Sequence, residues 1–154
     1  MIIKENSTAP DFCLKTDENS DLQLSKFKGK NIVLYFYPKD DTPGCTAEAC
    51  DFRDNMARLT TKDVVVIGVS KDSVKKHIKF KEKYSLPFNL LSDEEGKVCE
   101  LYGVFKEKSM YGKTYMGIER STFLIDKEQK IQKIWRNVKV KGHVDEILES
   151  LKSL

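Results

Sequence analysis

The chain has 154 residues, 40% of them hydrophobic, which is enough for one compact domain with a full core and too few for two typical domains. Its 27 Lys and Arg residues are interspersed with 24 Asp and Glu residues, so the net charge of +3 does not indicate a nucleic-acid partner. No run approaches the ~18 apolar residues of a membrane span, and the amino terminus has no apolar export segment. We therefore expect residues 1–154 to form a single cytoplasmic domain.

The first third of the chain predicts a hairpin, a central strand and a helix that begins with a cysteine. Two short apolar patches flank a polar turn at residues 16–21, which is typical of a β-hairpin covering one edge of a sheet. Residues 32–37 form a β-branched and aromatic run typical of a strand buried on both faces, and Pro38 ends it. Thr42 followed by a proline is an N-cap followed by a residue suited to the first helical position, so the helix should carry Cys45 in its first turn.

The middle of the chain alternates strands and helices, which implies parallel pairing. A second buried-type strand is predicted over residues 64–70, and Ser70 or Asp72 can cap the lysine-rich helix that follows it. A short extended segment over residues 86–91 and a short helix over residues 98–102 come next.

The last third begins with a segment that has no clear period. Residues 106–117 mix Lys, Ser, Met, Tyr and Gly, so we predict a mobile loop there. Residues 121–126 and 131–136 predict two strands joined by a tight turn, and residues 144–154 predict a closing amphipathic helix. The whole order favours an α/β, thioredoxin-like fold, in which helices flank a mixed central sheet with an N-terminal β-hairpin and the active cysteine lies at a strand's carboxyl end.

The sequence contains four cysteines, too few for a disulfide scaffold, so catalytic or redox use is favoured wherever one is well placed. Cys13 lies on an expected edge strand and Cys99 in a short helix, each beside apolar residues, so both are expected to pack in the core. Cys45 differs because the start of a helix presents unpaired N–H groups and a partial positive charge, which favour the nucleophilic thiolate.

The helix that begins near Cys45 should place this thiol on its inner side. Cys45 would share that side with apolar residues at helical spacing, namely Ala49, Phe52, Met56 and Leu59. The lead-in of Thr42, Pro43 and Gly44 ahead of Cys45 favours chemistry over a purely structural cysteine.

Cys50 follows Cys45 by five residues, which in an intact helix is ~140° around and ~8–9 Å away. A disulfide requires Cα atoms within about 7 Å, so pairing the two would require the first turns of the helix to unwind. A half-buried Cys50 without a redox role is the alternative, because C-x₄-C alone is a weak signal. A tetrahedral metal site is disfavoured, since His77 and His143 are isolated in the sequence.

No histidine stands near Cys45 in the sequence, so the thiolate needs another partner. Arg120 precedes a predicted strand, where its permanent charge can be aimed over the end of the sheet; a surface ion pair with Glu119 is the alternative. Glu48, one turn after Cys45, would oppose the thiolate unless it orients an arginine, and a solvated helix residue is equally compatible with this position.

The motif Pro38-x-x-x-Thr42-x-x-Cys45 resembles the active-site signature of the peroxiredoxins, and Cys50 five residues later resembles their bacterioferritin comigratory protein (PrxQ) branch. The similarity extends over nearly the whole chain. It implies a thiol-dependent peroxidase with Cys45 as the peroxidatic cysteine and Cys50 as the resolving cysteine. It also implies hydrogen peroxide and organic hydroperoxides as substrates, thioredoxin as the reductant, and no metal, flavin or haem.

The same resemblance implies roles for four further residues. Thr42 would hydrogen-bond the peroxide oxygen, and Arg120 would stabilise the thiolate and the developing charge. Pro38 would shield the pocket, and Glu48 would match the acid that helps to hold the arginine.

Two other functions compete with this prediction. A general thiol–disulfide oxidoreductase is disfavoured, because such proteins carry C-x-x-C at the helix start. A non-enzymatic redox-sensing or client-holding protein could use the same disulfide, since unwinding would expose Phe52.

A resolving cysteine in the same helix needs no partner subunit, so we expect a monomer. The predicted loop could give organic substrates an apolar wall, formed by Met110, Tyr111, Tyr115 and Met116.

Overall fold

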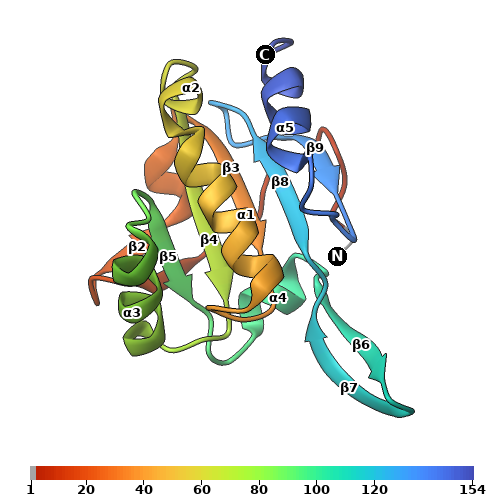
Figure 1. The fold of residues 1–154 in the computed structure, drawn as a ribbon. Helices are drawn as coiled ribbons and strands as arrows, with labels where there is room; N and C mark the ends of the chain where they lie inside the picture. The colour runs from red at the N-terminus through yellow and green to blue at the C-terminus, as the bar shows by residue number, and fades with distance from the viewer. Residues whose placement is uncertain (1–2) are drawn as a thin grey trace.

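The computed structural model describes residues 3–154 and shows a mixed sheet whose strands follow the order β2-β1-β5-β4-β3-β8-β9 (Figure 1). Met1 and Ile2 lie outside the described residues. The strands of this sheet are β1 (Cys13–Thr16), β2 (Asp21–Gln23), β3 (Asn31–Phe36), β4 (Val64–Ser70), β5 (Asn89–Ser92), β8 (Ser121–Ile125) and β9 (Ile131–Trp135). The helices are η1 (Leu24–Phe27), α1 (Pro43–Asp54), α2 (Met56–Thr60), α3 (Val74–Tyr84), α4 (Lys97–Leu101) and α5 (His143–Leu151). The predicted thioredoxin-like α/β plan is confirmed.

Strand β3 is central and buried throughout, as its β-branched and aromatic sequence predicts. It pairs in parallel with β4 and antiparallel with β8. Its side chains alternate between two apolar clusters, with Val33 and Tyr35 in one cluster and Leu34 and Phe36 in the other. The sheet therefore has a packed layer on each face.

The layer that contains Tyr35 is completed by helices α1, α2, α3 and α5, which contribute buried residues such as Phe52, Leu59, Phe80 and Ile147. The opposite layer is completed by η1, α4 and the amino-terminal segment. Helix α1 starts beside the carboxyl end of β3, so the predicted position of Cys45 at the end of a central strand is confirmed (Figure 1). Within residues 3–154, no helix is both long and apolar enough to cross a membrane.

The end of α1 and the cap of α3 differ from the sequence prediction. The predicted continuous helix breaks at Asn55, whose side-chain amide donates to the Asp51 carbonyl oxygen at 2.8 Å, and a separate α2 follows. Helix α3 is capped by Ser73, whose side chain accepts a hydrogen bond from the Lys76 N–H, and not by Ser70 or Asp72. Those two residues bind each other instead, as described below.

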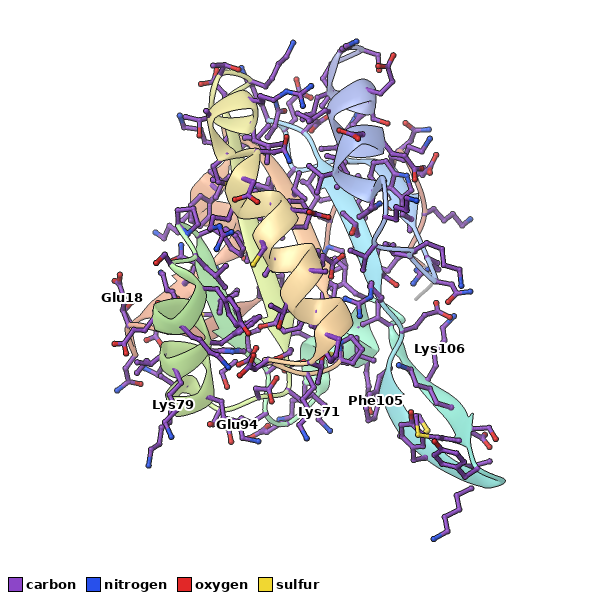
Figure 2. All side chains as sticks on the ribbon, viewed as in Figure 1. Glu18, Lys71, Lys79, Glu94, Phe105 and Lys106 are labelled. Carbon is purple, nitrogen blue, oxygen red and sulfur yellow. The ribbon has the colours of Figure 1, made fainter. Side chains whose placement is uncertain are left out.

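The predicted mobile loop over residues 106–117 is wrong, because this segment forms a two-stranded hairpin of β6 (Phe105–Met110) and β7 (Lys113–Ile118). The turn residues Tyr111 and Gly112 both have positive φ, 53° and 77°, as a tight hairpin turn requires. The hairpin extends away from the main sheet (Figure 1). Figure 2 shows Phe105 at its base, where the Lys71 ammonium lies 4.5 Å from the ring centroid.

The N-terminal hairpin of β1 and β2 is confirmed, and β2 forms the edge of the sheet. Strand β1 lies one position inside it, so Cys13 is not on an edge strand. The expectation that Cys13 packs in the core is also wrong: Cys13 is exposed, because its neighbours Phe12 and Leu14 are the ones that turn toward the core. Cys99 is fully buried, as predicted.

Candidate active site

The loop between β3 and α1 brings a cysteine to the end of the sheet. Thr42 occupies the N-cap position in an extended conformation, and Pro43 is the first helical residue, as predicted. The Thr42 side chain makes no capping bond; its hydroxyl donates to the Lys39 carbonyl oxygen at 2.8 Å. Cys45 lies in the first turn and is only 2% exposed. Pro38, directly after the strand, is half-buried.

Arg120, 75 residues after Cys45 in sequence, contacts both Cys45 and Glu48. One guanidinium nitrogen, Nη2, lies 3.4 Å from the Cys45 Sγ, and the other, Nη1, donates to Glu48 Oε1 at 2.7 Å. The alternative pairing with Glu119 is wrong, because that carboxylate binds the Lys106 ammonium at 3.3 Å. A permanent positive charge therefore faces the thiol at the start of a helix.

Sequence reasoning counted Gly44 in the lead-in to Cys45 but gave it no role in the site. A Cβ atom at position 44 would lie 3.0 Å from Arg120 Nη2, closer than ordinary van der Waals contact. The absence of a side chain thus lets the guanidinium pass directly over the first turn of α1. Its place between Pro43 and Cys45 is the one signal that could have identified it.

Glu48 is almost completely buried, with its side chain 1% exposed, so it is not a solvated helix residue. Burial raises the pKa of Glu48 to about 7, although the charge of Arg120 opposes this shift. Among the described residues, neither Glu48 Oε2 nor the Tyr35 hydroxyl has a hydrogen-bond partner. Tyr35 stacks on Phe52 with ring centroids 4.7 Å apart, and its pKa is raised by burial and then by the nearby charges of Glu48 and Cys45.

Cys50 is half-buried in the same intact helix as Cys45, and both are free thiols in the part of the chain that the structure describes. Helix geometry places the two Cα atoms ~8–9 Å apart, beyond the about 7 Å that a disulfide requires. The structure thus holds the two cysteines near each other but not within bonding reach.

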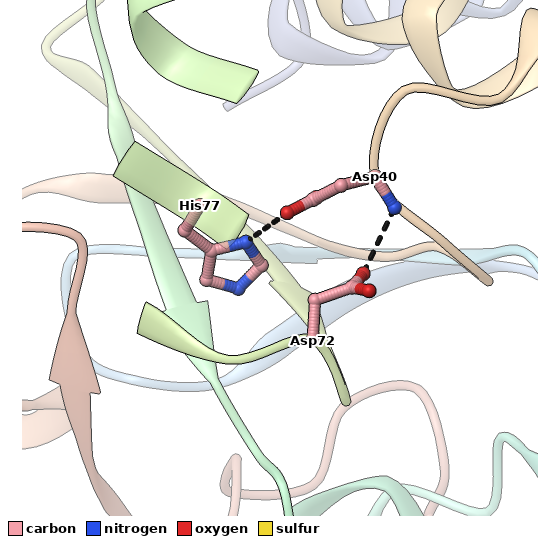
Figure 3. Close-up of side chains that lie close together, drawn as sticks. All are labelled: Asp40, Asp72 and His77. Atoms are coloured by element: carbon pink, nitrogen blue, oxygen red, sulfur yellow. Dashed lines mark hydrogen bonds and ion pairs between the residues drawn. The ribbon is translucent and has the colours of Figure 1, made fainter. Parts of the chain in front are cut away.

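Neither histidine is isolated in the folded chain. His143 pairs with the Thr122 hydroxyl at 2.8 Å. His77 lies beside Asp40 and Asp72, and one potential metal-ligand atom from each of these three residues lies within 4.8 Å of the other two (Figure 3). Sequence reasoning missed this cluster, because Asp40 lies 37 residues before His77 in the chain.

Comparison with known proteins identifies the family of the chain. The model of the AhpC/TSA family matches residues 6–134. Peroxiredoxin Bcp of Bacillus subtilis is 58% identical over 154 residues, which cover 100% of this chain and 98% of the relative.

Two solved structures have the same fold. A mutant of PrxQ from Xylella fastidiosa has a TM-score of 0.94 and 38% identity, and the match covers 99% of this chain and 98% of that one. The bacterioferritin comigratory protein of Xanthomonas campestris, studied for alkyl peroxide reduction, has a TM-score of 0.88 and 42% identity, with 92% and 90% of the two chains covered. The chain therefore belongs to the AhpC/TSA family and, within it, to the Bcp (PrxQ) peroxiredoxins.

Proposed function

We propose that this protein is a thiol peroxidase that reduces hydroperoxides at Cys45. The observation that carries the proposal is the guanidinium of Arg120, held by Glu48 at 2.7 Å and placed 3.4 Å from the Cys45 sulfur. The relative from Xanthomonas campestris is described for alkyl peroxide reduction, which supports organic hydroperoxides as substrates beside hydrogen peroxide.

In the first step the Cys45 thiolate attacks the terminal oxygen of the hydroperoxide. An S–O bond forms as the O–O bond breaks, and the departing oxygen takes up a proton to leave as alcohol or water. The sulfur is oxidised to a sulfenic acid and the peroxide is reduced. No metal, flavin or haem takes part in this scheme.

Three neighbouring residues support that step. The Thr42 hydroxyl gives its proton to a backbone carbonyl, which leaves oxygen lone pairs to accept a hydrogen bond from the peroxide O–H. Arg120 stabilises the negative charge on sulfur and on the departing oxygen. Pro38 shields the reacting atoms from water at the end of β3.

In the second step the Cys50 thiol condenses with the sulfenic acid, so that an S–S bond forms and water leaves. The distance between the two cysteines in α1 requires the start of this helix to unwind first. An external dithiol then reduces the disulfide, and we propose thioredoxin for this role. Because both cysteines lie in one helix, the cycle needs no second subunit, and we propose a monomer. Four cysteines are too few for a disulfide scaffold, and we propose a cytoplasmic location.

The test is NADPH consumption with thioredoxin, thioredoxin reductase and hydrogen peroxide. Cys45→Ser should abolish turnover, whereas Cys50→Ser should retain one stoichiometric oxidation and lose rapid regeneration. Cys13→Ser is the matched control and should turn over like the wild type, since this exposed residue lies on β1. Equal turnover in the Cys45 and Cys50 variants would refute the scheme. A single oxidation without turnover in the wild type, whatever dithiol is supplied, would indicate a redox sensor instead.

A further inference from the structure

The buried side chain of His77 holds the β3–α1 loop at Asp40, a residue that takes no part in the reaction. Asp40, in this loop, accepts hydrogen bonds on both carboxylate oxygens: from the Tyr37 hydroxyl at 2.6 Å and from His77 Nδ1 at 2.6 Å. The Asp40 backbone N–H donates to Asp72 Oδ2 at 2.8 Å (Figure 3). His77 itself is 0% exposed and comes from α3. The loop that leads to Cys45 is thus fixed to α3 through one buried side chain.

The hydrogen-bond partners assign the protons on His77. Its Nε2 lies 2.9 Å from the Leu91 carbonyl oxygen, which can only accept, so Nε2 carries a hydrogen. Its Nδ1 faces the Asp40 carboxylate and donates to it. With both nitrogens protonated, the ring is a cation against an anion. Burial lowers the pKa of His77, but the hydrogen bond and charge of Asp40 outweigh burial and leave it raised.

This arrangement suits a positioning role better than metal binding. Both nitrogens of His77 and both carboxylate oxygens of Asp40 already have hydrogen-bond partners in the protein. Asp72 Oδ2 also accepts from the Ser70 hydroxyl at 2.7 Å, so it is engaged twice. A cation would have to break these bonds in a dry interior.

A second contact joins the same helix to the same loop at the surface. Asp41 accepts from the Lys83 ammonium at 2.8 Å and from the Tyr84 hydroxyl at 2.7 Å. Asp41 and Lys83 are both exposed, so water and salt screen their attraction, and this contact contributes little. The buried pair of Asp40 and His77 is therefore the stronger of the two attachments between α3 and the loop.

We propose that His77 is a positioning residue of this enzyme: it holds Asp40 and thereby sets how often the loop and the start of α1 leave the folded arrangement in which Cys45 meets peroxide. The inference rests on the proposed function, because it assigns the control of the unwinding that lets Cys50 reach Cys45. Removal of the imidazole leaves the Asp40 carboxylate buried without its charged partner, which favours the open state.

The proposal predicts opposite effects on two competing fates of the Cys45 sulfenic acid. In the open state the sulfenic acid condenses with Cys50 and releases water. In the folded state it can instead attack a second hydroperoxide, which oxidises the sulfur to sulfinic acid and releases alcohol or water. A weaker attachment of the loop should therefore speed disulfide formation and protect the enzyme from over-oxidation.

The experiment measures both fates in His77→Phe, which keeps a ring of similar shape and removes both donors. Quenched-flow samples analysed by mass spectrometry give the amounts of sulfenic acid, disulfide and sulfinic acid over time. We expect condensation about 10-fold faster than in the wild type, from the loss of one charge-assisted hydrogen bond. The peroxide concentration that causes half over-oxidation should rise by a similar factor, and the first oxidation should not become faster.

Tyr37→Phe is the second variant, because it removes one donor to Asp40 and keeps the packing; it should change both quantities in the same direction by a smaller factor. Ile147→Val, in the same apolar cluster but on α5, and Lys83→Ala, at the exposed contact, are the controls and should leave the partition unchanged. Condensation in His77→Phe and Tyr37→Phe that is no faster than in the wild type would overturn the proposal. Failure of the wild type to form a sulfenic acid at all would overturn the proposed function instead.

Discussion

The buried carboxylate of Glu48 should make the protein less stable as pH rises. Its pKa in the folded state is about 7, against an ordinary value of 4.5. Between these values the folded state binds more protons than the unfolded state, so the free energy of unfolding falls with increasing pH. The full difference corresponds to about 3 kcal/mol, which is lost by the time pH exceeds the folded pKa.

Glu48→Gln has nearly the same shape as the wild type and cannot ionise, so it should escape this loss. Urea unfolding of both reduced proteins at pH 5, 6, 7 and 8 gives the difference in free energy of unfolding at each pH. Contributions from all other titrating groups are shared by the two proteins and cancel. We expect the variant to gain about 2 to 3 kcal/mol relative to the wild type between pH 5 and pH 8.

The same substitution should lower activity while it raises stability. At pH 8, above the Glu48 pKa of about 7, Gln at position 48 removes the negative charge that orients Arg120 toward Cys45. The rate constant for the first oxidation should then fall by about 10-fold, the loss of one charge-assisted hydrogen bond. Parallel stability curves for the two proteins from pH 5 to pH 8 would refute the reasoning. They would mean that Arg120 fully compensates the burial of the carboxylate.

Three further predictions test other residues. Gly44→Ala should slow peroxide reduction by up to about 10-fold in stopped-flow measurements and leave the melting temperature unchanged, because the new Cβ displaces Arg120. An unchanged rate would show that Arg120 can shift without a loss of activity. In a variant without the two active-site cysteines, a thiol reagent at neutral pH should modify exposed Cys13 rapidly. Cys99 should react only on unfolding, because it is buried and burial raises the pKa of its thiol. Two labels per chain by mass spectrometry under native conditions would contradict this prediction. Ser73→Ala should lower the free energy of unfolding by about 1 kcal/mol in urea, the usual loss for an N-cap.

The start of the active site is predictable from sequence, because Pro43 suits the first helical position, although Thr42 at the N-cap makes no capping bond. A threonine and a proline before Cys45 are sufficient to place its thiol in the first turn of α1, after a strand whose apolar sequence is typical of the centre of a sheet. The pairing of Arg120 is different. From the residues alone, Glu119 and the cysteine compete for it, and only the three-dimensional contact with Glu48 decides.

The hairpin of β6 and β7 could not be predicted from periodicity. Most of its side chains are exposed on both faces, so no alternation of apolar and polar residues marks the strands. The pair of Asp40 and His77 left no signal either, because 37 residues separate them and a buried ion pair has no characteristic spacing. The cap of α3 is predicted wrongly for a different reason. Several neighbouring polar residues can cap a helix there, and the sequence favours Ser70 or Asp72 although Ser73 is the N-cap.

The alternation of β3 between two apolar clusters has a consequence for protein engineering. Leu34 and Phe36 pack with α4 on one face of the sheet, whereas Tyr35 packs with α1 and Cys45 on the other. Substitutions that are well separated in space and share no partners have nearly additive effects. The layer around α4 can therefore be redesigned for higher thermal stability with little change in catalysis, because the catalytic cysteine packs on the opposite face of the sheet.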